Sequence, residues 1–158
     1  AETGAIIEYL LNKYDKEFTL HPRGNAKNHQ DYLFWLHFAE GSLMGPLTMA
    51  LILSTVIQKT PFIMKPIAKG IVAAIEAGYL GNQIKTLLGF TEDHLGKSDF
   101  FLGESLSAAD IVMSFPLEAS IAGRIKASDY PNIARFVKRI KEMDSYKKAL
   151  EVGGEYSY

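Results

Sequence analysis

The sequence predicts an all-α protein, a helical bundle with one long, kinked helix and one central, buried, capped helix. Apolar residues recur at helical spacing along almost the whole chain. No segment shows the alternation of apolar and polar residues, bounded by turn residues, that is typical of a half-buried strand. The 158 residues are 47% apolar and 22% charged, which suits one globular domain with a sizeable core. We therefore expect essentially no β-sheet.

A polar linker separates the first two predicted helices. An apolar stripe predicts a short first helix that ends near Tyr14. The stripe consists of Ile6, Ile7, Leu10 and Leu11. Residues 15–24 are polar and end in the helix-breaking cluster His21-Pro22-Arg23-Gly24. Asn25 has the side chain of an N-cap, so we expect a second helix over residues 26–54.

The middle of this second helix carries two unusual features. The Gly45-Pro46 pair should kink it, because Pro46 lacks a backbone donor and crowds the preceding turn. Residues 41–58 carry no charge, and this run is nearly as long as a membrane span. Almost half of them are small or polar, however, and no cluster of Lys and Arg flanks the run. We therefore expect a buried core helix and no membrane span.

A third helix should run from about Ile67 towards Leu95, with glycines that could break it at positions 78, 81 and 89. Its expected buried side comprises Ile71, Ala74, Ile75, Leu80, Ile84, Leu87 and Leu88. The apolar residues 100–104, which include a glycine, predict a packed bend after this helix.

The strongest local signal is the segment Leu106-Ser107-Ala108-Ala109-Asp110-Ile111. With Ser107 as N-cap, its hydroxyl can accept from the Asp110 N–H, while the Asp110 carboxylate accepts from the Ser107 N–H. Leu106 and Ile111 stand where a hydrophobic staple requires them. The helix that follows is apolar on all sides, so we expect it to be central and buried. Two further helices should start near Pro131 and Asp144, before a polar, aromatic tail that ends in Tyr156-Ser157-Tyr158.

Composition excludes several kinds of function. Lys plus Arg number 17 and Asp plus Glu 18, so no basic surplus points to a nucleic acid as partner. The absence of cysteine excludes disulfides, thiolate zinc sites and a cysteine nucleophile among these residues. The four histidines share no metal-ligand spacing, so we expect no metal site. We expect a cytoplasmic protein, in keeping with the lack of cysteine.

The order of these features resembles the C-terminal all-helical domain of the cytosolic glutathione transferases. The resemblance rests on the capped stretch 106–117, on the helix start Pro131-Asn132-Ile133 and on the helix over residues 32–53. Residues 1–14 resemble the last helix of the family's thioredoxin-like N-terminal domain. The implied division is residues 1–16 for that terminal helix, 17–24 for a linker and 25–158 for the C-terminal domain. The sequence around residues 40–43 and 113–117 looks most similar to a branch shared by fungi and bacteria.

The resemblance implies that Glu2 and Thr3 bind the γ-glutamyl end of glutathione. A helix N-terminus offers unpaired N–H groups and a positive dipole end, which suit the α-carboxylate of the ligand. The Thr3 hydroxyl adds a donor, where serine is usual in the family, and Glu2 adds a negative charge for the ammonium group. The alternative is that Thr3 only caps its helix and that Glu2 only stabilises the dipole.

The second helix should supply the wall that faces the second substrate. His37, Gly41 and Met44, followed by Thr48, fall on one face of a regular α-helix. Residues at similar places in the family approach glutathione or the electrophile. The alternative is that these side chains only pack or face solvent.

The implied reaction is attack of the glutathione thiolate on an electrophile, with glutathione as co-substrate and no other cofactor. The family's thiol-activating Ser, Tyr or Cys lies near the start of the thioredoxin-like domain, upstream of these residues. We therefore assign no catalytic residue here and expect the 158-residue chain alone to be inactive. The resemblance also implies a homodimer. The rival hypothesis is a non-catalytic, transferase-like module for docking of proteins.

Overall fold

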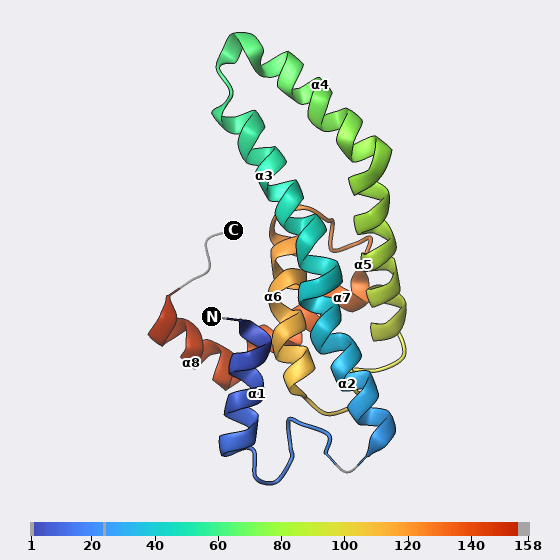
Figure 1. Ribbon diagram of the computed structural model, residues 1–158, viewed down its shortest axis with the longest axis vertical. Helices are drawn as coiled ribbons and strands as arrows, with labels where there is room; N and C mark the ends of the chain where they lie inside the picture. Colours follow the sequence, from blue (N-terminus) through green and yellow to red (C-terminus); the bar gives the residue numbers. More distant parts are fainter. Residues whose placement is uncertain (1, 24, 155–158) are drawn as a thin grey trace.

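The computed structural model describes residues 2–23 and 25–154, and these ranges form a helical bundle without a strand (Figure 1). An isolated bridge joins Phe100 and Gly103. The all-α class is therefore confirmed, whereas the tail Tyr156-Ser157-Tyr158 lies outside the described residues. The α-helices are α1 (Thr3–Tyr14), α2 (Ala26–Phe38), α3 (Gly45–Lys59), α4 (Lys65–Ile75), α5 (Gly81–Leu95), α6 (Ala108–Gly123), α7 (Pro131–Glu142) and α8 (Asp144–Gly153). Short helical turns are η1 (Ala39–Met44), η2 (Phe62–Met64) and η3 (Glu76–Leu80).

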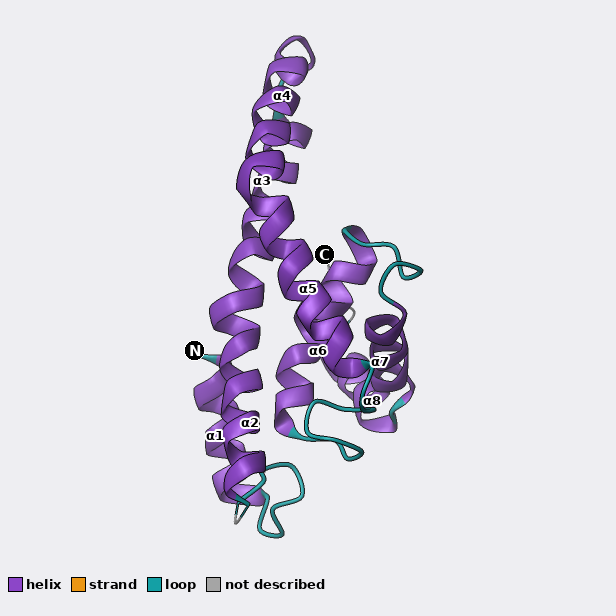
Figure 2. Cartoon of the chain, turned by 90° about the vertical axis from the view of Figure 1, so that its right-hand side faces the viewer, coloured by secondary structure: helices purple, strands orange, loops and turns teal. Residues whose placement is uncertain are grey.

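Two long helical arms dominate the shape. The first arm is α2, η1 and α3, and the second is α4, η3 and α5, with η2 at the turn between them. Figure 1 shows that the lower half of this hairpin packs beside α6, whereas α3 and α4 project beyond the rest of the molecule. The side view in Figure 2 shows the same projection, with α7 and α8 on the far side of α6.

The long first arm is interrupted where the sequence predicted a kink. Asn25 caps its start as expected, since its side-chain oxygen accepts from the Asn28 N–H at 3.1 Å. The π-helical turn η1 then ends directly before Gly45-Pro46, and Pro46 occupies the first turn of α3. Proline is tolerated at that position because its missing donor would have no partner in a new helix. The interruption is thus a π turn that lets one helix end and another begin on nearly the same axis.

The second arm breaks at one of its predicted glycines. The π turn η3 spans Gly78 and is followed at once by Gly81. A Cβ atom at Gly81 would lie 2.8 Å from the Glu76 carbonyl oxygen, closer than real Cβ contacts. Glycine is therefore required where the wide turn closes onto α5.

The predicted central helix is confirmed as α6. Phe101 N–H and Ser107 N–H both donate to the Asp110 carboxylate at 2.8 Å, and the Ser107 hydroxyl donates to it at 2.6 Å. The carboxylate thus binds the α6 cap and also the preceding bend, in which Phe100 and Phe101 are buried. Burial raises the pKa of the Asp110 carboxyl, although these hydrogen bonds oppose the shift.

The prediction that residues 41–58 are buried is wrong for their second half. Leu43, Pro46 and Ala50 are buried, but Leu51, Ile52 and Val56 are exposed. Burial of Leu80, Ile84 and Leu88 is confirmed, whereas Ile71, Ala74 and Ile75 are exposed. Both sets of residues are exposed for the same reason. The helices α3 and α4 cover each other on one side only, and they extend past the helices that would complete a core around them. The run Ala26–Lys59 remains long and apolar enough to cross a membrane by length and composition.

Candidate functional site

The start of α1 combines an unusual backbone with open N–H groups. Glu2 is the N-cap residue and has φ 70° and ψ 98°, a conformation that costs a non-glycine residue about 1–3 kcal/mol. Its carbonyl accepts the Ile6 N–H at 3.0 Å, which closes the first turn. Its side chain makes no cap hydrogen bond to any described residue. Thr3 is the first helical residue, and both side chains are exposed.

Thr3 therefore does not stand at the N-cap position, which is where a capping threonine would be found. The Glu2 side chain does not replace it as a cap. The first-turn N–H groups of α1 are consequently available to an anion from outside the helix. In both Figure 1 and Figure 2 this end of α1 lies level with the upper end of α2.

A shallow hollow of about 400 Å³ lies along α2. It is lined by Gln30, Leu33, Phe34, His37, Phe38 and Ser42. The His37 and Phe34 side chains are exposed, and the Phe34 ring contacts the buried ring of Trp35 edge to face, with centroids 5.0 Å apart. Of the three residues predicted for the second wall, only His37 lines this hollow. Gly41 is exposed, and a Cβ atom added there would meet no described atom outside its own stretch of helix within 4 Å, whereas Met44 is half-buried.

The predicted common face of these residues assumed a regular α-helix. The turn η1 begins at Ala39, between His37 and Met44, and a π turn takes one residue more than an α turn. Side chains after η1 are therefore displaced by about one position, roughly 100°, around the helix. This shift could not be predicted from the sequence, because propensity and periodicity do not distinguish a π turn from an α turn.

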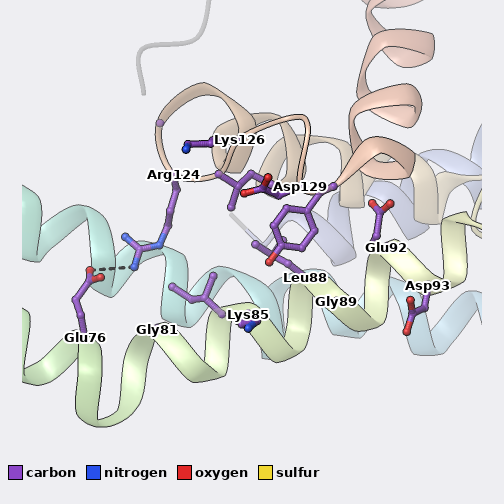
Figure 3. A pocket seen from close by; sticks show the side chains of 14 residues that line it. Glu76, Gly81, Lys85, Leu88, Gly89, Glu92, Asp93, Arg124, Lys126 and Asp129 are labelled. Carbon is purple, nitrogen blue, oxygen red and sulfur yellow. Dashed lines mark hydrogen bonds and ion pairs between the residues drawn. The ribbon is translucent and has the colours of Figure 1, made fainter.

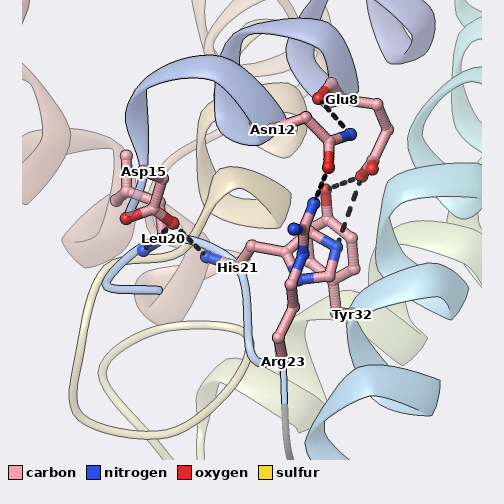
Figure 4. A network of polar contacts seen from close by, with 7 residues as sticks. All are labelled: Glu8, Asn12, Asp15, Leu20, His21, Arg23 and Tyr32. Atoms are coloured by element: carbon pink, nitrogen blue, oxygen red, sulfur yellow. Dashed lines mark hydrogen bonds and ion pairs between the residues drawn. The ribbon is translucent and has the colours of Figure 1, made fainter. Parts of the chain in front are cut away.

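A polar network holds α1 against α2 (Figure 4). The Tyr32 hydroxyl, which comes from α2, donates to a Glu8 carboxylate oxygen on α1 at 2.5 Å. The Nε2 atom of His21, in the connecting loop, lies 3.7 Å from the same oxygen. Burial and the bond to Glu8 raise the pKa of the Tyr32 hydroxyl, which therefore stays protonated and donates.

The loop residues complete this network. The carboxylate of Asp15, at the end of α1, accepts from the backbone N–H groups of Leu20 and His21 at 3.0 Å. Arg23 donates to the Asn12 side-chain oxygen. Burial lowers the pKa of His21, with Arg23 and the nearby His29 acting in the same direction and Glu8 opposing them. The Nδ1 atoms of both histidines are buried and have no partner among the described residues.

Sequence reasoning missed this network because its members are brought together only by the path of the loop. From the sequence, His21 was recognised only as part of a helix-breaking cluster, and Glu8 had no predicted role. Nothing in the local pattern links them to Tyr32, which is 24 residues from Glu8. The contact fixes how α1, and hence Glu2 and Thr3, are oriented on the bundle.

A larger pocket of about 800 Å³ lies between the second arm and the loop after α6 (Figure 3). At one end, the Arg124 guanidinium binds the Glu76 carboxylate at 2.9 Å. At the other, the Glu92 carboxylate accepts from the Asn132 and Ile133 N–H groups at 2.8 and 2.9 Å, so it caps α7. Glu76, Arg124 and Glu92 are thus engaged in contacts within the fold, and the pocket includes none of the residues predicted from the sequence to bind a ligand.

Among the described residues, no group of three or more His, Asp or Glu side chains could hold a metal ion. His21, Glu8 and His29 approach one another but do not form such a group.

Comparison with known proteins points to one family. The family described as glutathione S-transferase, C-terminal domain, matches residues 53–144. The chain is 32% identical over 154 residues to glutathione S-transferase 1 of Saccharomyces cerevisiae, covering 96% of the chain and 65% of that protein. It is 29% identical over 150 residues to glutathione S-transferase 3 of Schizosaccharomyces pombe, covering 95% and 62%. The chain thus spans less than two thirds of either relative.

A solved structure shows the same fold. A glutathione transferase from Phanerochaete chrysosporium, crystallised with oxidized glutathione, superposes with a TM-score of 0.74 at 22% identity. The match covers 96% of this chain and 66% of that one.

Proposed function

Because this chain belongs to the glutathione S-transferase family through its C-terminal domain, we propose that it is the helical part of a glutathione transferase. In this proposal the protein joins the thiolate of glutathione to an electrophile, with glutathione as co-substrate. The observation that carries the proposal is the backbone of Glu2, held at φ 70° beside the open start of α1. Such strain in an exposed, non-glycine residue is typical of functional positions, where other contacts compensate for it.

Glu2 and Thr3 bind the γ-glutamyl end of glutathione in this proposal. The Glu2 backbone has a positive φ, and its side chain is not used as a cap. Its carboxylate is then available to the ligand ammonium group. The N–H groups of the first turn and the Thr3 hydroxyl bind the α-carboxylate, supported by the helix dipole.

His37 contributes to the wall for the second substrate, with Gly41 and Met44 beside it. The hollow next to His37 is lined by Leu33, Phe34 and Phe38, which suits an apolar electrophile. Gly41 leaves open space on the same arm. The displacement by η1 makes His37 the residue of the three that we expect to influence the choice of electrophile most.

The division into residues 1–16, 17–24 and 25–158 is part of the same proposal. Ile6, Tyr9 and Leu10 of α1 are exposed apolar residues, as expected for a helix that packs against a thioredoxin-like sheet. The thiol-activating residue belongs to that thioredoxin-like domain, so no catalytic residue is assigned here. We further propose a homodimer in the cytoplasm.

Kinetics of the complete transferase tests the glutathione site. Glu2→Ala removes the contact with the ammonium group, so KM for glutathione should rise about tenfold while KM for 1-chloro-2,4-dinitrobenzene changes little. Glu151→Ala, which removes another exposed glutamate at the far end of the chain, is the matched control. Equal behaviour of the two variants would contradict the assignment of Glu2.

Retention on immobilised glutathione tests the function itself. A glutathione transferase should be retained on immobilised glutathione and eluted by free glutathione, and it should also catalyse conjugation of glutathione to an electrophile. Absence of both retention and turnover in the complete protein would favour the rival hypothesis of a docking module.

The variant His37→Ala tests the wall for the second substrate. It should change the ratio of kcat/KM between a small and a bulky electrophile.

A further inference from the structure

The turn between α3 and α4, here called the hairpin tip (residues 59–69), presents large apolar side chains to solvent. The short turn η2, which consists of Phe62, Ile63 and Met64, follows Pro61 at the end of the projecting hairpin (Figure 1). Phe62 is 87% exposed and Ile63 is 85% exposed. Folding of the chain gains nothing from two such residues, so their exposure points to an apolar environment outside the chain.

The charge around the hairpin tip is of one sign. Lys59, Lys65 and Lys69 lie within it, and no Asp or Glu occurs between Glu40 and Glu76. The 158 residues together have a net charge of −1, so these three lysines form a local positive surplus. Lys59 and Lys69 are exposed and Lys65 is half-buried, and none forms an ion pair with a described residue.

Apolar side chains and lysines are arranged in the order that a bilayer surface requires. The apolar residues lie at the extremity, and a lysine stands within three positions on either side of them. Lys69 follows one helical turn further from the extremity. Long lysine side chains can bury their methylene groups and keep the ammonium group at the level of the lipid headgroups.

We propose that the hairpin tip binds the surface of an anionic lipid bilayer. Phe62 and Ile63 enter the boundary between headgroups and acyl chains, about 5–10 Å deep, while the three lysines bind lipid phosphates and carboxylates. This contact is peripheral and uses none of the residues proposed to bind glutathione, Glu2 and Thr3, which lie at the start of α1.

The structure favours a peripheral contact over a membrane span. The run Ala26–Lys59 is long enough to span, but its first half belongs to the bundle core. Tyr32, Trp35 and Leu36 are buried there against α6 and its neighbours. Spanning would require these contacts to break, whereas the hairpin tip can reach a membrane without any change in the fold.

Co-sedimentation with vesicles tests the proposal. The complete protein should bind vesicles of phosphatidylserine and phosphatidylcholine mixed at about 1:2, and the affinity should fall with salt. The variant Lys59→Gln/Lys65→Gln/Lys69→Gln should lose about a hundredfold in affinity, at roughly fivefold per lysine. The variant Phe62→Ser/Ile63→Ser should lose at least about tenfold.

Val152→Ser provides the matched control. Val152 is 84% exposed, at the end of α8, and no lysine lies within three positions of it. Its loss should leave vesicle binding unchanged. Equal losses for Val152→Ser and Phe62→Ser/Ile63→Ser would overturn the proposal, as would equal affinity for pure phosphatidylcholine vesicles.

Insertion itself can be measured with tryptophan. Trp35 is buried, so Phe62→Trp adds one exposed indole whose emission should shift to the blue on binding and be quenched by lipids brominated near the headgroup. Val152→Trp should show neither change. Two results together would show that a second copy covers the hairpin tip and that the proposal is wrong. The first is a blue shift of the Phe62→Trp emission when protein concentration is raised without lipid. The second is a change of oligomeric state, instead of vesicle binding, in Phe62→Ser/Ile63→Ser.

Discussion

Asp110→Ala should lower the free energy of unfolding by about 3 kcal/mol, roughly three times the effect of Ser107→Ala. The Asp110 carboxylate is fully buried and accepts three hydrogen bonds, at 2.6 to 2.8 Å. Its removal leaves the N–H groups of Phe101 and Ser107 buried without an acceptor. Each such orphaned donor costs about 1–3 kcal/mol. Part of this cost is offset, because burial of the carboxylate is itself unfavourable.

Ser107→Ala is milder because it removes a hydroxyl donor and leaves both N–H bonds to Asp110 in place. We expect about 1 kcal/mol for this change. In the double variant the hydroxyl has already lost its acceptor. The decrease in the free energy of unfolding of the double variant should therefore exceed that of Asp110→Ala alone by a few tenths of a kcal/mol at most. The two effects are then clearly non-additive.

Urea unfolding followed by helical circular dichroism measures both quantities from the midpoint and slope. Asp144→Ala is the control, since Asp144 also stands in the first turn of a helix but is fully exposed. Its midpoint should match that of the parent protein. Equal effects of Asp110→Ala and Ser107→Ala, or additive effects in the double variant, would refute the role of Asp110 as a link between the cap and the bend at Phe101.

Three further outcomes are expected. Gly81→Ala should destabilise by about 1–3 kcal/mol in urea unfolding because its Cβ meets the backbone, whereas Gly70→Ala, where no described atom is within 4 Å, should be neutral or stabilising. Burial lowers the pKa of His21, so the unfolded chain takes up a proton at higher pH than the folded one. The free energy of unfolding should therefore fall as pH falls below about 6.5, and His21→Gln should flatten that part of the profile; an unchanged slope would contradict this. The 158-residue chain alone should give a helical circular-dichroism spectrum without turnover of glutathione, and turnover above the uncatalysed rate would show that the thiol-activating group is within it.

The fold could be predicted to a large extent because its signals are local. The Asn25 cap, the Ser107–Asp110 pair and the Gly45-Pro46 break all act within a few residues of themselves, and each is confirmed. Burial was predicted less well. Ile71 and Ile75 have the spacing of a core face, yet they are exposed because α4 extends beyond the helices that would cover it.

In the candidate site, too, some features could be predicted from local sequence and others depend on the folded chain. Glu2 and Thr3 could be singled out from the sequence, but the positive φ of Glu2 and its unused side chain are properties of the folded chain. The shared face of His37 and Met44 was inferred from a regular helix, and the turn η1 changes that register. A π turn forms because of what packs around it, which no local pattern contains.

By itself, the sequence determined the helical class, the order of the helices, the caps at Asn25 and Ser107, and the stretch between residues 40 and 76 that carries lysines and no acidic residue. These depend on backbone chemistry and on composition, which act along the chain. The tertiary structure alone decided that Glu8, His21 and Tyr32 meet and that half of the most apolar arm stands outside the bundle. Contacts of this kind join residues far apart in the chain, and whether an apolar side chain is buried depends on which other helices reach it.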